Sequence, residues 1–181
     1  MPAAVSQRPA PVSEAVRLMP VNNVLMSAAI SAVERAFTMC GMSVRCVGAS
    51  AVPVRDGGKI TGMIGVHGKV SGFITLNMTE RIAIRAVDGL LQEQFTELNS
   101  QVVDATGEIT NMVVGGIKAS LGSTQWAFSQ ITIPSVIVGQ GYSIAYARSL
   151  EFLNVIFEHD DKEAVLLEDR LIQVSISLLT L

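Results

Sequence analysis

The amino-acid sequence predicts an α+β fold, in which long helices pack on an antiparallel β-sheet built from two related halves. Segments with apolar residues at helical spacing alternate with segments that are rich in β-branched residues and broken by Gly and Pro. A helix followed by Gly41 and Pro53 is matched, at the same separation, by a helix followed by Gly122 and Pro134. Side-chain identity between the two halves is poor, so the repeat rests on the order of elements.

Composition indicates one folded domain. The chain has 181 residues, of which 49% are hydrophobic and 16% are charged. This balance provides enough apolar surface for a sizeable core. Four of the six prolines lie among the first 20 residues. We therefore expect residues 1–21 to form a flexible lead-in and residues 22–181 to form a single domain.

Three helices are predicted from side chains that can cap a helix and from the apolar spacing that follows them. Gly41 and Gly122 follow the first and third helices, where a glycine commonly ends a helix. The predicted helices are residues 23–40 capped by Asn22 or Asn23, residues 80–94 capped by Thr79, and residues 97–121 capped by Thr96.

The remaining segments read as strands joined by turns at residues 55–59 and 158–163. The last segment alternates only weakly, so it is either a fully buried strand or a strand that pairs with another subunit. The expected strands are residues 43–54, 61–68, 70–78, 129–139, 142–148, 150–157 and 170–181.

Several classes of function are disfavoured. The net charge is −3, and no basic stripe with interleaved aromatics indicates a nucleic-acid partner. No apolar run approaches the roughly 20 residues of a membrane-spanning helix. No secretory signal is visible. Cys40 and Cys46 are interpreted as reduced, buried thiols of a cytoplasmic protein, although a disulfide or a metal pair remains open.

One face of the third helix carries polar residues at helical spacing. At about 100° per residue, Asp104, Glu108, Asn111 and Gly115 share a narrow face. The apolar residues cluster on the opposite face, which we expect to pack against the sheet. These apolar-face residues are Val102, Ile109, Met112, Val113 and Gly116, the last expected to serve internal packing.

A solvated helix surface is the simpler interpretation of such a face, but the residue types disfavour it. Asn111 lies in mid-helix although Asn is a poor helix former. Gly107 and Gly115 each cost up to about 1 kcal/mol at positions that we expect to be exposed. Glycines beside the polar pair remove bulk, which lets another surface approach closely. The face is therefore interpreted as a docking site.

Other chemistry-bearing residues lack a supporting pattern. His67, expected at a strand–turn, and His159, expected in the solvated acidic turn, have no Cys or carboxylate at metal-ligand spacing. The glycine-rich residues 62–72 contain neither a GxGxxG sequence opening a helix nor a Walker lysine. No G-x-S-x-G elbow occurs. We predict no metal site in this chain.

The spacing Asp104-x3-Glu108-x2-Asn111, followed by Pro134, resembles the signature of the CheC/CheX/FliY phosphatases of bacterial chemotaxis. The sequences GEITNMVVGGIKASL and ITIPSVIVGQG are similar to those of CheX-type members, and a single motif points to that branch. The resemblance covers the chain from about Asn22 onward and implies a CheC-like fold. The proline-rich lead-in has no counterpart that we can assign.

The resemblance implies that the chain dephosphorylates the aspartyl phosphate of a CheY-like response regulator. Asn111 would position the attacking water, and Glu108 would pair with the receiver's lysine. Asp104, Gly107 and Gly115 are expected to contact the substrate protein. Pro134 is expected to be structural. No cofactor of its own is implied, because Mg²⁺ belongs to the receiver's active site.

The last expectations concern the assembly of the protein and an alternative function. The resemblance implies a homodimer joined through sheet edges, to which the C-terminal segment could contribute. The alternative function is a non-catalytic adaptor that binds a receiver or a motility component. The presence of both Glu108 and Asn111 favours the phosphatase.

Overall fold

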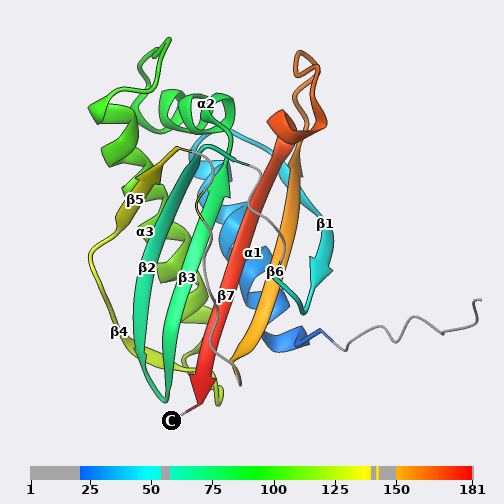
Figure 1. The fold of residues 1–181 in the computed structure, drawn as a ribbon, viewed down its shortest axis with the longest axis vertical. Helices are drawn as coiled ribbons and strands as arrows, with labels where there is room; N and C mark the ends of the chain where they lie inside the picture. Colours follow the sequence, from blue (N-terminus) through cyan, green and yellow to red (C-terminus); the bar gives the residue numbers. More distant parts are fainter. Residues whose placement is uncertain (1–20, 54–57, 140–141, 143–149, 181) are drawn as a thin grey trace, which may run out of the picture.

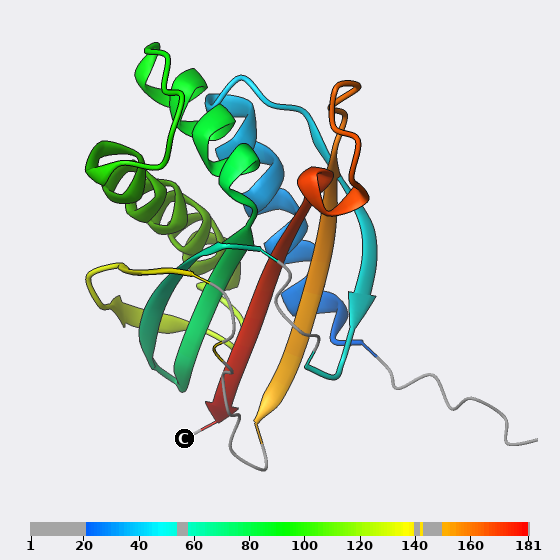
Figure 2. The ribbon, with the colours of Figure 1, turned by 45° about the horizontal axis from the view of Figure 1, so that its top comes forward.

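The computed structural model describes residues 21–53, 58–139, 142 and 150–180. In this part of the chain, three helices cover one face of an antiparallel sheet (Figure 1). Figure 2 shows the helices side by side on that face. The predicted α+β class with an antiparallel sheet is confirmed.

The elements follow the predicted order, with two differences in the second half. The predicted strand 129–139 is divided in two, and a short 3₁₀ helix precedes the last strand. In chain order the elements are α1 (Asn23–Met39), β1 (Val44–Ser50), β2 (Ile60–Gly68), β3 (Val70–Met78), α2 (Glu80–Leu91), α3 (Ser100–Leu121), β4 (Phe128–Ile131), β5 (Ser135–Val138), β6 (Glu151–His159), η1 (Leu167–Arg170) and β7 (Leu171–Thr180). Of the predicted strand 142–148, residues 143–148 lie outside the described residues.

Strand β7 lies in the middle of the sheet. The strand order is β1-β6-β7-β3-β2-β4, and β5 also pairs with β2. Val174 of β7 faces Leu76 of β3 on one side and Val155 of β6 on the other. The last segment is therefore a buried strand with both edges paired, and the alternative that it pairs as a strand with a second subunit is wrong.

The first two helices begin at their predicted caps. The Asn22 side chain accepts hydrogen bonds from the backbone N–H groups of Val24 and Leu25, both at 3.2 Å. Thr79 accepts from Ile82 N–H at 3.4 Å. Gly41 has φ +68°, the left-handed conformation that a glycine adopts after a helix.

The third helix begins later than the sequence indicated. Asn99, not Thr96, is its N-cap, and the Asn99 side chain accepts from Val102 N–H at 3.0 Å. Both residue types cap helices well, so the sequence alone could not choose between them. Gly122 follows the helix in a right-handed conformation, so it does not form the left-handed end that Gly41 forms.

Helix α3 is held on two sides. Toward α1, a Cβ atom on Gly116 would lie 2.9 Å from Cβ of Ala32, so the two helix backbones approach closely. The packing role predicted for Gly116 is confirmed. Toward the sheet, the Thr110 side chain occupies the space that a side chain on Gly62 of β2 would need. Helix α3 therefore has a fixed position between α1 and the sheet.

The acidic segment between β6 and β7 is less solvated than predicted. Asp161 is only 3% exposed, and its carboxylate lies 2.9 Å from Arg81 and 3.6 Å from Arg85 of α2. Ion pairs between this buried carboxylate and the partly exposed arginines therefore link the β6–β7 connection to α2.

Candidate functional site

The predicted polar residues of α3 share the face that the spacing indicated. Asp104 and Glu108 are exposed, and Asn111 and Gly115 are partly exposed. On the opposite side, Val102, Ile109 and Val113 are fully buried, whereas Met112 is only partly buried. Helical periodicity thus separated the two faces correctly at most positions.

The three polar side chains are not engaged by the rest of the described chain. Among the described residues, neither Asp104, Glu108 nor Asn111 has a hydrogen bond or an ion pair from its side chain. A structural role would normally tie a mid-helix Asn to a neighbouring group, because its amide competes for backbone hydrogen bonds. The face is therefore free to contact another molecule.

Two buried threonines on the inner side of α3 have their hydroxyl groups hydrogen-bonded within the helix. The Thr106 hydroxyl donates to the Val102 carbonyl at 2.7 Å, and the Thr110 hydroxyl donates to the Thr106 carbonyl at 2.8 Å. Both side chains are 0% exposed. Since these polar groups find partners within the helix, α3 packs closely on the sheet without leaving their hydroxyls unsatisfied.

Gly107 does not lie on the exposed face. It is buried, and a Cβ atom there would lie 3.5 Å from Cβ of Pro134 and 3.6 Å from Cγ2 of Val136. The expectation of exposure is wrong because the β4–β5 connection covers this side of α3. Gly107 is therefore a packing position beneath Pro134, without surface for a substrate protein.

Pro134 lies between β4 and β5, where it divides the strand that the sequence predicted as continuous. Proline cannot donate a backbone hydrogen bond to a strand ladder, which accounts for the break. Its ring packs against α3 at Gly107. Pro134 thus borders the polar face on the side nearest Asn111.

Gly115 and Gly116 differ in their surroundings. Nothing lies within 4 Å of a Cβ atom built on Gly115, so this position opens toward solvent. Gly116 faces α1, where Nη2 of Arg35 is 3.7 Å from the equivalent position. Of these two glycines, only Gly115 lies on the open side of the helix, where the missing side chain leaves room for another surface.

Sequence reasoning missed one residue beside this face. Ile133 immediately precedes Pro134, and its side chain is 87% exposed. A large apolar residue directly before the motif proline was the available signal, but the expected strand 129–139 would have placed it in a sheet. The break between β4 and β5 exposes it instead.

The two histidines lie on β2 and β6, which are not neighbours in the sheet. His67 lies in β2, exposed, with Nδ1 2.5 Å from the Ser71 hydroxyl. His159 ends β6 and is 5% exposed, with Nδ1 2.8 Å from the Ser43 carbonyl. The expectation of a solvated His159 is wrong, since β6 extends through this residue.

Both cysteines are free thiols. Burial raises the pKa of Cys40 to about 11, because the thiolate is poorly solvated there. Cys46 is only partly buried. Within the described residues, no group of three or more His, Cys, Asp or Glu side chains is arranged to hold a metal ion.

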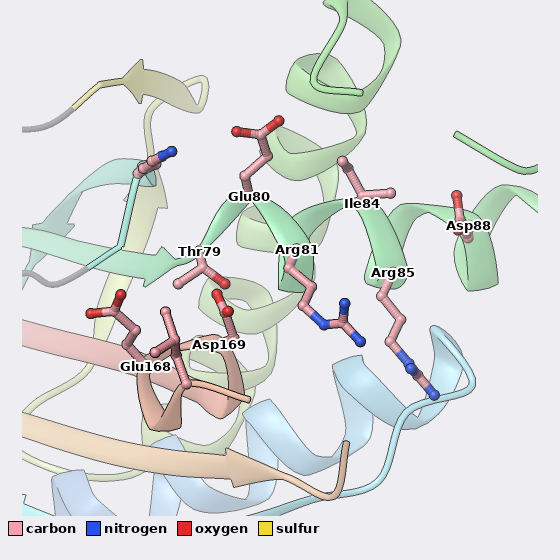
Figure 3. A pocket seen from close by; sticks show the side chains of 10 residues that line it. Thr79, Glu80, Arg81, Ile84, Arg85, Asp88, Glu168 and Asp169 are labelled. Carbon is pink, nitrogen blue, oxygen red and sulfur yellow. The ribbon is translucent and has the colours of Figure 1, made fainter. Parts of the chain in front are cut away.

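A separate open pocket lies at the start of α2, where η1 faces the helix (Figure 3). It encloses about 620 Å³ and is lined by side chains of both signs, including Arg81 and Arg85 from α2 and Glu168 and Asp169 from η1. Arg81 and Arg85 are already paired with Asp161. This mixed charge does not select an anion or a cation, and the polar face of α3 does not line the pocket.

No helix among the described residues combines the length and the apolar character that crossing a membrane requires.

Comparison with protein families gives a direct match over more than half of the chain. The family model described as chemotaxis phosphatase CheX matches residues 60–158. This range contains Asp104, Glu108, Asn111 and Pro134. A search of curated proteins found no significant match.

Solved structures share the fold at low sequence identity. CheX from Vibrio vulnificus superposes with a TM-score of 0.69 at 23% identity, covering 87% of this chain and 97% of that one. CheX from Desulfovibrio desulfuricans gives 0.70 at 22% identity, covering 84% and 98%. The structure of a CheX–CheY–BeF3–Mg²⁺ complex from Borrelia burgdorferi gives 0.67 at 22% identity, covering 86% and 95%. Each of these structures therefore aligns with more than four fifths of this chain.

Proposed function

Because the chain belongs to the CheX family of chemotaxis phosphatases, we propose that it hydrolyses the aspartyl phosphate of a CheY-like receiver. The exposed side chain of Glu108 and the partly exposed side chain of Asn111 have no partner among the described residues and lie one turn apart on a fixed helix, and this arrangement carries the proposal. The Borrelia structure, in which CheX is in complex with CheY, BeF3 and Mg²⁺, supports a receiver as the partner. Chemically, BeF3 stands in for the phosphoryl group.

Asn111 is proposed to position the attacking water. A carboxamide offers an acceptor and two donors without carrying charge, so it can hold a water in line with phosphorus. A carboxylate at the same place would be repelled by the phosphoryl oxygens. Phosphoryl transfer needs positioning and charge stabilisation more than covalent chemistry, so one amide on a rigid helix is a sufficient contribution from this chain.

Glu108 is proposed to pair with the lysine of the receiver's phosphoryl pocket. The carboxylate projects from the same face one turn before Asn111, so the ion pair would fix the register of α3 in that pocket. Asp104, one turn earlier, is proposed to make a contact at the rim. Gly115 is proposed to let the receiver surface approach the helix closely.

The receiver is proposed to supply the remaining groups. Its own acidic pocket holds Mg²⁺, which neutralises charge that develops on the phosphoryl oxygens. This chain is therefore proposed to need no cofactor of its own. Its residues enter the partner's site, orient a water and exclude bulk solvent.

A decay assay tests the proposal. A CheY-like receiver is phosphorylated with acetyl phosphate, the donor is removed, and loss of phosphate is followed with and without this protein. Faster decay in its presence supports the phosphatase. Unchanged decay, together with measurable binding, would support the adaptor function instead.

A homodimer joined through sheet edges remains part of the proposal. With β7 paired on both sides, β1 at one end of the sheet and β4 with β5 at the other are the described edge strands available for it. Light scattering tests the assembly, and a monomeric mass at micromolar concentration would contradict it. A cytoplasmic location, where receivers of this kind act, is proposed with the function.

A further inference from the structure

We propose that Ile133 is an apolar docking residue that contacts the receiver surface beside its phosphoryl pocket. This inference rests on the proposed function, since it names a further contact for the same partner.

The backbone around Ile133 is held on both sides. On one side, Thr132 N–H donates to the Gly65 carbonyl of β2 at 2.9 Å, and Gly65 N–H donates to the Thr132 hydroxyl at 2.9 Å. On the other side, Pro134 packs on α3 at Gly107. The Thr132 hydroxyl also lies 3.2 Å from the carbonyl of Ile133, to which it can donate. These contacts fix the position of the Ile133 backbone.

The side chain nevertheless points away from the core. Ile133 is 87% exposed, and its neighbours Thr132 and Ser135 are also exposed. A single exposed apolar residue is common on protein surfaces. One held between a strand and a helix loses little entropy on binding, which favours a role in an interface.

Ile133 lies beside the polar face. Pro134 contacts α3 at Gly107, and Gly107 directly precedes Glu108 and lies one turn before Asn111. A receiver that admits Glu108 and Asn111 into its pocket must therefore pass the β4–β5 connection. The polar residues that would enter the receiver's pocket therefore lie next to an exposed apolar residue. In the complex this apolar side chain would be buried, and a few buried side chains carry most of the binding energy of an interface.

The test compares Ile133→Ser with a matched control on another part of the surface. Val165 is 93% exposed and lies between β6 and β7, so Val165→Ser removes a similar apolar side chain remote from α3. Binding is measured by titration against a CheY-like receiver activated with beryllium fluoride and Mg²⁺. Ile133→Ser is expected to raise Kd about tenfold, whereas Val165→Ser and the conservative Ile133→Val leave it within about twofold.

A second measurement separates docking from hydrolysis. At saturating concentrations, the Ile133→Ser variant is expected to dephosphorylate the receiver at the wild-type rate, because Asn111 and Glu108 remain in place. Equal affinity of Ile133→Ser and wild type would overturn the inference while wild-type hydrolysis still stands. Binding by the wild type without any hydrolysis would instead overturn the proposed function and leave the docking contact supported. A Kd change accompanied by a changed oligomeric mass would overturn it in favour of contact between copies of this chain.

Discussion

Gly116 of α3 lies so close to Ala32 of α1 that a Cβ atom on Gly116 would stand 2.9 Å from Cβ of Ala32 and 3.2 Å from its Cα. Both helices are fixed by their own contacts, so an added methyl group must push them apart. Gly116→Ala is therefore expected to lower the free energy of unfolding by about 1–3 kcal/mol. Urea denaturation followed by circular dichroism measures the change, and an unchanged or higher stability would contradict this packing.

At the neighbouring Gly115, the same substitution is expected to have the opposite effect on stability. Because its surroundings are open, Gly115→Ala adds helix propensity and is expected to raise stability by up to about 1 kcal/mol. If the receiver approaches the helix here, the same methyl group weakens binding by about tenfold. The variant thus separates stability from affinity. An affinity equal to that of the wild type would show that Gly115 is not in the contact.

Asn111→Ala is expected to abolish most of the catalysed dephosphorylation while leaving binding nearly intact. Removing the amide takes away the group that holds the attacking water, and loss of such positioning reduces rates by about a hundredfold or more. Single-turnover decay and titration of a beryllofluoride-activated receiver measure the two effects separately. A variant that retains the wild-type rate would exclude the proposed role of Asn111.

Glu108→Ala is expected to weaken receiver binding by at least about tenfold, because the truncated ion pair leaves the receiver lysine uncompensated. Glu34→Ala is the matched control, since Glu34 is also exposed on a helix but lies on α1. A double-mutant cycle with the receiver lysine changed to alanine identifies the partner. If the two changes have fully additive effects, the proposed pairing is wrong.

The sequence predicted the polar face well because one physical pattern determines it. Helical periodicity separates Glu108 from the buried Ile109 and Val113 without any knowledge of tertiary structure. The predicted exposure of Gly107 failed because a distant segment covers it, and no local pattern reports that Pro134 packs there. The repeat between the two halves stays a prediction. In its favour, β3 and β6 have equal lengths and are separated along the chain by the same distance as Gly41 and Gly122.

Other errors also arise from tertiary contacts. The acidic composition of residues 158–163 is typical of a solvated turn, yet Asp161 is buried against two arginines of α2. Similarly, polar and apolar residues alternate only weakly in the last strand, so the sequence did not show which strands it pairs with. Its position between β6 and β3 became clear only from the pairing of the whole sheet.

Asp161 gives the fold a predictable response to acid. Burial by itself would raise the pKa of this carboxyl group, but the Glu163 backbone N–H and the Arg81 and Arg85 guanidinium groups lower it below its usual value. Since the folded pKa is lowered, the stabilisation is present above the unfolded pKa of about 3.9 and is lost as pH falls through the folded value. Asp161→Asn is expected to lower stability at pH 7 by about 1–3 kcal/mol.

Urea denaturation of the wild type and Asp161→Asn at several pH values measures this contribution. The difference in unfolding free energy between the two proteins should stay nearly constant from pH 7 to about pH 5 and then shrink as pH falls through the unfolded and folded pKa values of Asp161. Asp160→Asn is a useful control, because Asp160 is exposed and forms no ion pair among the described residues. A difference that stays constant with pH would contradict the linkage.

The central place of β7 has a consequence for how the sheet assembles. Without that strand, β1 and β6 form one ribbon and β2, β3, β4 and β5 form another, with no described pairing between them. The two described ribbons can join into one sheet only through β7, so they stay separate until this strand takes its place between β6 and β3. Until then, the facing edges of both ribbons present unpaired backbone groups that are open to wrong partners.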